Sequence, residues 1–416
     1  MPDWRPVDVA PGSEPIGTVS ARLAACPVDE SEHFMPDAFA SKYGKAAPPP
    51  SRTVLLNPGP VNVHERVRSA LAYPDVCHRE PEVADLMTRV RAKATAVCGG
   101  DETCTSVLLA GSGTAALEAA VSSVVPADGR ILVLDNGNYG LRIHLIVATH
   151  GIDETYLEFG WTNPIDPAAV ERALVDDPTI THVAMVHHET STGMLNPVRA
   201  IGEITHRLGR SLLVDAISSV GAESFDMLAD HVDWCVATAN KCLEGLPGVS
   251  FVCAPRSRFE ELADVPAHTF YLDLHGHYRG QAIVGAPLFT PAVQVMFAFE
   301  QALDLVLEET VTGRAARYAE LAAQVRAGLA ERGMEFLLPA EHWSNSVTNV
   351  MVPDGVRYAD LHDGLKDEGY VVYGVQEELG AVFRVANMGQ LDEADIKGFF
   401  SALDRVLPAV RTGGAA

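Results

Sequence analysis

Two charged residues stand where short apolar runs of the sequence end, and together they suggest one kind of chemistry. Lys241 follows the apolar and hydroxylated segment 235–239, and Asp215 ends the apolar run 211–214. A lysine amine can form a Schiff base with an aldehyde, and a carboxylate can pair with a protonated pyridine nitrogen. These are the two protein groups that pyridoxal phosphate chemistry needs. Two ordinary charges at strand ends are the alternative interpretation.

Both residues need particular surroundings to act in this way. A partly buried Asp215 stays ionised only beside a cation, because desolvation disfavours the charged carboxylate. The ammonium form of Lys241 is not a nucleophile, so its pKa must be lowered or the amine must be captured by the cofactor. We therefore expect each residue to lie in an enclosed site that contains the partner it requires.

A glycine- and hydroxyl-rich turn, Ser112, Gly113 and Thr114, follows another apolar run and opens a helical pattern. Glycines let backbone N–H groups approach an anion, hydroxyls add donors, and a helix N-terminus supplies positive potential. The segment contains neither GxxxxGK[ST] nor a complete GxGxxG, so the usual nucleotide loops are not present. It predicts an anion-binding turn, and an ordinary strand-to-helix turn remains the alternative.

Three further positions could contribute to the same site. Tyr139, on a glycine-flanked loop, can lie flat against a planar ring, although tyrosines at the rim of a core are common. Paired histidines and Glu189 precede the hydroxyl cluster 190–192 and raise the question of a metal. Adjacent side chains on an extended segment point to opposite sides and no HExxH spacing is present, which disfavours a metal. The hydroxyl cluster is better suited to hydrogen-bonding a cofactor hydroxyl or a substrate. Arg384 lies in an apolar strand pattern, where it needs an anionic partner: a bound carboxylate or phosphonate, or a structural salt bridge.

These residues lie within or soon after short apolar runs that alternate along the sequence with helical patterns. This alternation predicts an α/β fold with a mostly parallel sheet. The expected strands are residues 106–110, 131–134, 182–187, 212–214, 232–237, 249–253, 349–352 and 382–385; the expected helices are residues 82–97, 113–120, 141–149, 200–208, 292–309, 315–332 and 393–406.

The composition narrows the class of protein. The 416 residues carry a net charge of -24, which disfavours nucleic acid or an anionic membrane as the main partner. Seven scattered cysteines without CxxC pairs favour reduced thiols over disulfides or a zinc site. Neither a secretory signal pattern nor a run of 18 apolar residues is found, so we expect a cytoplasmic protein.

The predicted domain organisation has four parts. Residues 1–50 are polar and end in a proline run, which indicates an N-terminal extension. Residues 51–74 are expected to join a small domain. Residues 75–314 would form the large domain, and residues 315–416 the small C-terminal α+β domain.

Taken together and in this order, the segments resemble the class V aminotransferases of the fold-type I pyridoxal phosphate enzymes. The likeness runs from Leu55 to Arg384, and its most specific segment is 239–248. It implies a large domain with a mostly parallel seven-stranded sheet, a smaller C-terminal α+β domain, and transfer of an amino group from a small-molecule donor to a 2-oxo acid. Segments 136–140, 188–193 and 239–248 are most similar to the members that act on an aminophosphonate with pyruvate.

The resemblance also implies roles at individual positions. Lys241 would form the Schiff base with pyridoxal phosphate and Asp215 would pair with its ring nitrogen. The remaining implied contacts are with the cofactor phosphate (Ser112, Gly113 and Thr114, assisted by Thr238 or Asn240), with the ring (Tyr139 and Thr190), with the phosphate of the neighbouring subunit of a homodimer (Thr290), and with the acidic group of the substrate (Asn57, Gly59 and Arg384).

Some features depart from the family pattern and leave other functions open. The arm 1–50 has no counterpart, and Asn57 replaces a usual threonine at the substrate end of the site. Alanine or serine with glyoxylate, or a related aminophosphonate, is therefore the nearest alternative substrate set. A desulfurase needs a reactive cysteine well downstream of Lys241, but only Cys242 and Cys253 follow it. A non-catalytic descendant would not need both Lys241 and Asp215.

Overall fold

A computed structural model describes residues 52–375 and 379–412 of the chain. The chain from Arg52 onward forms one compact unit. The extension predicted for residues 1–50 lies outside the described residues. In the part of the chain that the structure describes, no helix has the length and apolar character needed to cross a membrane.

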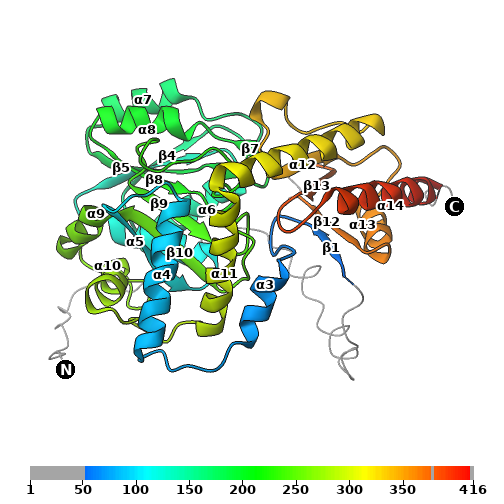
Figure 1. Ribbon diagram of the computed structural model, residues 1–416. Helices are drawn as coiled ribbons and strands as arrows, with labels where there is room; N and C mark the ends of the chain where they lie inside the picture. The colour runs from blue at the N-terminus through cyan, green and yellow to red at the C-terminus, as the bar shows by residue number, and fades with distance from the viewer. Residues whose placement is uncertain (1–51, 376–378, 413–416) are drawn as a thin grey trace, which may run out of the picture. The chain divides into compact units, whose positions relative to one another are not determined.

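A seven-stranded sheet forms the framework of the larger half of this unit (Figure 1). Strands β9, β8, β5, β3 and β4 run parallel, whereas β10 is antiparallel to both β2 and β9. This confirms the mostly parallel seven-stranded sheet. The strands, in spatial order, are β2 (Cys104–Ala110), β10 (Val249–Pro255), β9 (Trp234–Thr238), β8 (Ser211–Asp215), β5 (Ile180–Val186), β3 (Arg130–Asp135) and β4 (Glu154–Glu158).

Helices cover both faces of this sheet because its strands are apolar on both sides. In β2, Leu108 belongs to one buried cluster while its neighbours Val107 and Leu109 belong to the other, as the alternation of side chains along a strand requires. One cluster includes side chains of α4 (Pro81–Val97), α7 (Pro167–Asp176), α8 (Val198–Arg207) and α11 (Val293–Glu309); the other includes those of α5 (Gly113–Val124), α6 (Asn138–His150) and α10 (Leu274–Tyr278).

A second sheet joins segments from the two ends of the described chain. Its order is β1 (Val54–Leu56), β12 (Tyr370–Gly374), β13 (Val382–Ala386) and β11 (Val347–Met351). Strand β1 is parallel to β12, and β13 is antiparallel to both of its neighbours. A separate core packs this sheet against side chains of α12 (Val311–Glu331), α13 (Tyr358–Asp367) and α14 (Glu393–Thr412). The boundaries proposed at residues 74 and 314 stay a prediction, and α12 runs across the second.

The differences from the predicted elements have simple causes. Strand β4 was not predicted because this edge strand, with the sequence ETYLE, has no buried residue. Helix α14 continues past the predicted end at residue 406 to Thr412, with Pro408 inside it. Strand β5 ends at Val186, one residue before the predicted end.

Candidate active site

Lys241 lies in the turn that follows β9, where the chain leaves the sheet. Its side chain is partly buried, and its amine donates a hydrogen bond to the carbonyl oxygen of Pro58. Burial lowers the pKa of Lys241, and the nearby charge of Arg384 lowers it further, while Tyr139 and Asp215 act in the opposite direction. The structure thus supplies the enclosed setting that a nucleophilic lysine needs.

The turn after β1 fits closely against this lysine. Gly59 has a φ of 85°, and a Cβ added there would lie 2.8 Å from Cδ of Lys241 and 3.0 Å from the carbonyl oxygen of Asn240. Asn57, in the same turn, is buried and donates from Nδ2 to the carbonyl of Pro60 at 2.9 Å. Its Oδ1 has no hydrogen-bond partner among the described residues. The segment at the N-terminal end of the described chain therefore forms one wall of the lysine site.

Asp215 is the last residue of β8, next to β9 in the sheet. The carboxylate is buried, with 3% of the residue exposed, and Oδ1 accepts a hydrogen bond from the backbone N–H of Ile217 at 3.0 Å. Burial raises the pKa of Asp215 to about 6, although Ile217, Arg142 and Lys241 each favour the ionised form. A protonated ring nitrogen bound here would offset that desolvation.

The predicted anion-binding turn lies at the N-terminus of α5. Ser112 is the N-cap residue and is exposed, and its side chain makes no capping hydrogen bond. Gly113 packs against Ile217, so that an added Cβ would lie 2.7 Å from Ile217 Cδ1. The guanidinium of Arg142 donates to Thr114 Oγ1 at 3.0 Å. Helix potential and a nearby cation therefore both favour an anion at this turn.

Tyr139 is the second residue of α6, and two neighbours fix its position. Cζ of Arg142 lies 4.5 Å from the centre of the Tyr139 ring. Glu189, which is fully buried, accepts hydrogen bonds from the backbone N–H groups of Tyr139 at 3.0 Å and Gly140 at 3.2 Å. Burial raises the pKa of Glu189 to about 7, and these hydrogen bonds oppose the increase. Arg142 thus connects three predicted cofactor residues, since it also stabilises the charge of Asp215.

Thr190 and Arg384 meet at the junction of the two sheets. Arg384, in β13, donates to the carbonyl oxygens of Thr190 at 3.1 Å and Gly374 at 2.9 Å. The guanidinium is buried, which lowers its pKa, while Tyr139 and Glu189 raise it. Within residues 52–375 and 379–412 it forms no salt bridge, so the alternative of a structural ion pair finds no partner there. Its charge remains available to a bound anion.

Thr238 and Asn240 flank the lysine turn. The Thr238 hydroxyl donates to Asn240 Oδ1 at 2.9 Å and lies 3.2 Å from the carbonyl of Val249. This bond holds Thr238, at the end of β9, against Asn240, which directly precedes Lys241. Neither hydrogen-bonds to Ser112, Gly113 or Thr114 within the described residues, so their assistance to that turn stays a prediction.

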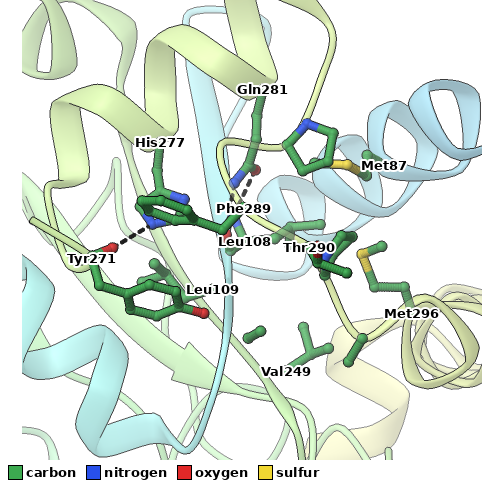
Figure 2. Close-up of a pocket in the computed structure, with 14 residues that line it drawn as sticks. Met87, Leu108, Leu109, Val249, Tyr271, His277, Gln281, Phe289, Thr290 and Met296 are labelled. Carbon is green, nitrogen blue, oxygen red and sulfur yellow. Dashed lines mark hydrogen bonds between the residues drawn. The ribbon is translucent and has the colours of Figure 1, made fainter. Parts of the chain in front are cut away.

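Thr290 lies on the wall of a pocket beside the end of β2 (Figure 2). Gln281 anchors this wall by pairing with the backbone N–H of Leu108 at 2.9 Å and its carbonyl at 2.7 Å. His277 hydrogen-bonds to the carbonyl of Tyr271 at 2.8 Å. Thr290 is exposed, and neither Lys241 nor the other central site residues line the pocket. A contact across a subunit interface stays a prediction.

Paired histidines also lie near this site, and both are buried. Burial lowers the pKa of His187 to about 4 and that of His188 to about 3, so both rings are neutral at pH 7. Nδ1 of His188 lies 3.1 Å from the carbonyl of Ser218 and therefore carries the proton. No group of three or more ligand side chains is placed to hold a metal among the residues that the structure describes.

Known proteins resemble this chain over most of its length. The aminotransferase class-V family matches residues 64–374. A 2-aminoethylphosphonate–pyruvate transaminase of Syntrophobacter fumaroxidans is 37% identical over 352 residues, which are 84% of this chain and 94% of that protein. This chain is a class V aminotransferase. A second 2-aminoethylphosphonate–pyruvate transaminase, from Salmonella typhimurium, is 34% identical over 84% of this chain and 96% of its own length.

Solved structures agree with this assignment. The class V aminotransferase is similar to pyridoxamine–pyruvate aminotransferase from Mesorhizobium loti, with a TM-score of 0.81 and 28% identity over 88% of this chain and 94% of that one. It is also similar to an aspartate aminotransferase from Thermus thermophilus, with a TM-score of 0.78 and 27% identity over 86% and 99% of the two chains. The fold is that of the fold-type I enzymes, and the cofactor is pyridoxal phosphate.

The residues of the site fit this cofactor. The hydroxyl oxygen of Thr190 is buried without a hydrogen-bond partner among the described residues, as expected for a group that serves a ligand. Asp215 is buried with a carboxylate that needs a cation, and Ser112, at the N-terminus of α5, leaves its side chain free of a capping hydrogen bond. Ring nitrogen, ring substituents and phosphate therefore each have a matching group in this chain.

Three residues near the site were not predicted from the sequence. Arg142 was missed because its link to Tyr139 and Thr114 arises from packing of α6 on α5. Ile217 gave no chemical signal, since an isoleucine after an aspartate is ordinary. Glu189 was considered only as a possible metal ligand beside the paired histidines; its place directly before the hydroxyl cluster 190–192 is the signal that could have revealed its role.

Proposed function

We propose that this class V aminotransferase transfers the amino group of 2-aminoethylphosphonate to pyruvate, giving phosphonoacetaldehyde and L-alanine. The observation that carries the proposal is Arg384, a buried guanidinium without a salt bridge in the described residues, close enough to Lys241 to lower its pKa. A phosphonate is a strong partner for such a guanidinium. The two relatives that are 37% and 34% identical carry the name of this reaction.

The proposed cofactor contacts use both the strand ends and the helix N-terminus. Lys241 would bind the aldehyde carbon, Asp215 the ring nitrogen, and Tyr139 one face of the ring. Thr190 would reach the ring hydroxyl. Ser112, Gly113 and Thr114 would hold the phosphate, with Thr238 or Asn240 assisting. When bound, pyridoxal phosphate supplies an electron sink that makes a proton on the amine-bearing carbon removable.

Proton transfer is assigned to Lys241. A lysine with a lowered pKa has a neutral amine at pH 7 to 8 in a larger fraction of molecules, so Nζ can accept a proton from the substrate carbon and return it. The Asp215 carboxylate would pair with the protonated ring nitrogen. The acidic group of the donor would bind Arg384, with the Asn57 and Gly59 turn as the opposite wall. These contacts orient the carbon whose proton moves toward Nζ.

The enzyme is proposed to act as a homodimer in the cytoplasm, with Thr290 contributed to the phosphate site of the neighbouring subunit. Large exposed apolar side chains in the segment 270–284, which precedes Thr290 in sequence, support an interface: Phe270, Ile283 and Val284 are 83%, 66% and 72% exposed. The six cysteines that the structure describes are free thiols, as expected for a reducing compartment.

A donor panel tests the proposal. Purified enzyme with pyruvate is supplied in turn with 2-aminoethylphosphonate, alanine and serine, the last two also with glyoxylate. We expect alanine formation from pyruvate with 2-aminoethylphosphonate and ping-pong kinetics. Activity with alanine or serine and glyoxylate but none with 2-aminoethylphosphonate would replace the proposed donor.

A matched variant tests the role of the lysine. Lys241→Ala should abolish transamination and remove the absorbance of the lysine-bound cofactor at roughly 400–430 nm. Lys93→Ala is a suitable control because Lys93 forms salt bridges with Glu300 and Asp304. A fully active Lys241→Ala enzyme would contradict the assignment.

A further inference from the structure

A buried carboxylate lies close to the catalytic lysine but takes no part in the proposed chemistry. Glu244 has 1% of its surface exposed, and its backbone N–H donates to the carbonyl of Lys241 at 2.9 Å. Its φ is 58°, a conformation that is unfavourable for a residue with a side chain. Such backbone persists only where surrounding contacts enforce it. The contacts of the Glu244 side chain should therefore show which element holds the turn in this conformation.

Those contacts are made with α12. Glu244 Oε1 accepts hydrogen bonds from Arg317 Nη2 at 2.7 Å and from the Tyr318 hydroxyl at 2.9 Å. Arg314 lies 3.8 Å from Oε2, and both arginines also pair with Glu309. Two carboxylates thus balance two guanidiniums, so the group can be buried without net charge.

Tyr318 connects this group to the strand that carries Arg384. Its hydroxyl accepts from the backbone N–H of Gly389 at 3.0 Å, and its carbonyl accepts from Nδ2 of Asn387 at 3.1 Å. Asn387 directly follows β13, which ends at Ala386, and Gly389 lies two residues further on. Burial raises the pKa of Tyr318 well above its ordinary value, so the hydroxyl stays protonated and donates a hydrogen bond to Glu244. One phenol thereby joins the lysine turn to the end of β13.

We propose that Glu244 and Tyr318 are positioning residues that set the distance between Lys241 and Arg384, and thereby select donors by the length of chain between amine and acidic group. The inference rests on the proposed function, because it takes Arg384 as the site of the acidic group. The connection from Lys241 to Arg384 passes through the turn to Glu244, then through the hydrogen bond to Tyr318. From Tyr318 it continues through the hydrogen bond from Gly389 to the end of β13. Rigid coupling of this kind fixes the geometry of reaction without touching the substrate.

Tyr318→Phe is the central test because it removes one oxygen and leaves the buried ring in place. The wild type should prefer 2-aminoethylphosphonate over 3-aminopropylphosphonate in kcat/KM by roughly 10-fold or more, the discrimination typical of one methylene. In Tyr318→Phe we expect this preference to fall to roughly 3-fold or less, because the two anchors can adjust to the longer donor. An equal loss of activity toward both donors, with the ratio unchanged, would overturn the proposal.

Tyr278→Phe is the matched control. Tyr278 is also buried, stacks on Phe259 and places its hydroxyl 3.4 Å from Glu260, away from the lysine turn. This variant should keep the donor ratio of the wild type even if its melting temperature falls. A change in the ratio equal to that of Tyr318→Phe would show that any lost buried hydroxyl has this effect, and it would also overturn the proposal.

Amide hydrogen exchange supplies a measurement that needs no turnover. In holoenzyme with Glu244→Gln, exchange at Gly389 and adjacent residues should quicken by roughly 5-fold or more, since about 1 kcal/mol of local stability is a factor of that size. In sequence, α12 and the strands β11, β12 and β13 all lie between the altered residue and the measured amide. Unchanged exchange at Gly389 would show that the lysine turn and β13 are not coupled.

The two proposals fail in different ways. If the wild type ignores every aminophosphonate but uses another donor, the proposed substrate is wrong, whereas the exchange experiment still decides the coupling. Suppose instead that the wild type uses 2-aminoethylphosphonate, that Tyr318→Phe keeps the donor ratio of the wild type and that Glu244→Gln keeps its exchange rates. The proposed substrate is then correct, and the positioning role of Glu244 and Tyr318 is wrong.

Discussion

At the scale of single residues, the two cations of the site influence each other. Burial lowers the pKa of both Lys241 and Arg384, and the charge of Arg384 further disfavours the ammonium form of Lys241. An acidic substrate group bound at Arg384 would cancel part of that effect. Substrate binding and the proton affinity of the lysine are thus electrostatically linked.

Replacing the arginine should expose this link. Arg384→Gln is expected to lower kcat/KM for an acidic donor by roughly 100-fold or more, mainly through KM, because a buried ionic contact worth about 2–5 kcal/mol is lost. The pKa of Lys241 should rise, which is measured from the pH dependence of the cofactor absorbance. Arg332→Gln, which removes an exposed pair with Asp404, is the control. An unchanged KM would exclude Arg384 as the acid-binding residue.

The glycine beside Lys241 supports a second prediction. Gly59→Ala should lower stability by about 1–2 kcal/mol and activity by roughly 10-fold or more, because a Cβ there meets the lysine side chain. Gly333→Ala has the same unfavourable sign of φ, 69°, with no atom within 4 Å of the added Cβ. Thermal unfolding should show a loss for both variants, the larger one for Gly59→Ala, and enzyme assays a loss for Gly59→Ala alone. Equal activities would contradict the assigned contact.

At the scale of elements, Glu223 ties the loop after β8 to the segment before β11. It accepts hydrogen bonds from the backbone N–H of Asn345 at 2.6 Å and from its Nδ2 at 2.8 Å. Burial raises the pKa of Glu223 to about 8, although Asn345 and Arg326 favour the ionised form. The carboxyl is therefore neutral in the folded protein at pH 7 and ionised in the unfolded chain.

This contact predicts a pH dependence of stability. Because the pKa of Glu223 is higher in the folded protein than in the unfolded chain, the folded protein binds its proton more tightly. The contribution of this proton to the free energy of unfolding is fully present below pH 4.5 and is lost as pH rises toward about 8. The loss is at most about 1.4 kcal/mol per pH unit. Glu223→Gln should flatten the decline of unfolding free energy between pH 5 and 8. Parallel curves for the two proteins would refute it.

Strands and helices with a strong apolar pattern could be predicted from the sequence, and so could the polar site residues at their ends. Lys241, Asp215 and Thr114 lie at the strand and helix termini where the pattern placed them, because chemistry and periodicity coincide there. Strand β4 was not predicted because none of its residues is buried and Glu154, Thr155 and Glu158 are polar. The contact between Glu244 and Tyr318 was not predicted, because no local feature of the sequence indicates which distant helix a buried carboxylate will contact.

At the scale of the whole molecule, the exposed apolar side chains of the segment 270–284 bear on assembly. Phe270→Asp should convert the proposed dimer to monomer in analytical ultracentrifugation, and it should weaken cofactor retention because Thr290 would no longer reach a neighbouring site. Val175→Asp is the control, since Val175 is 60% exposed on α7, outside this group. A wild type that sediments as a monomer with full cofactor would rule out the shared site.

The pairing of β1 with β12 has a consequence for biosynthesis. The turn that leaves β1 carries Pro58, whose carbonyl accepts from Lys241, yet β1 finds its partner strand only when residues 370–372 have been made. The large sheet can form on the ribosome well before that moment, since its last strand ends at Pro255. A nascent chain would thus hold a finished sheet and an open lysine site, and competence to react would arrive only as translation nears its end.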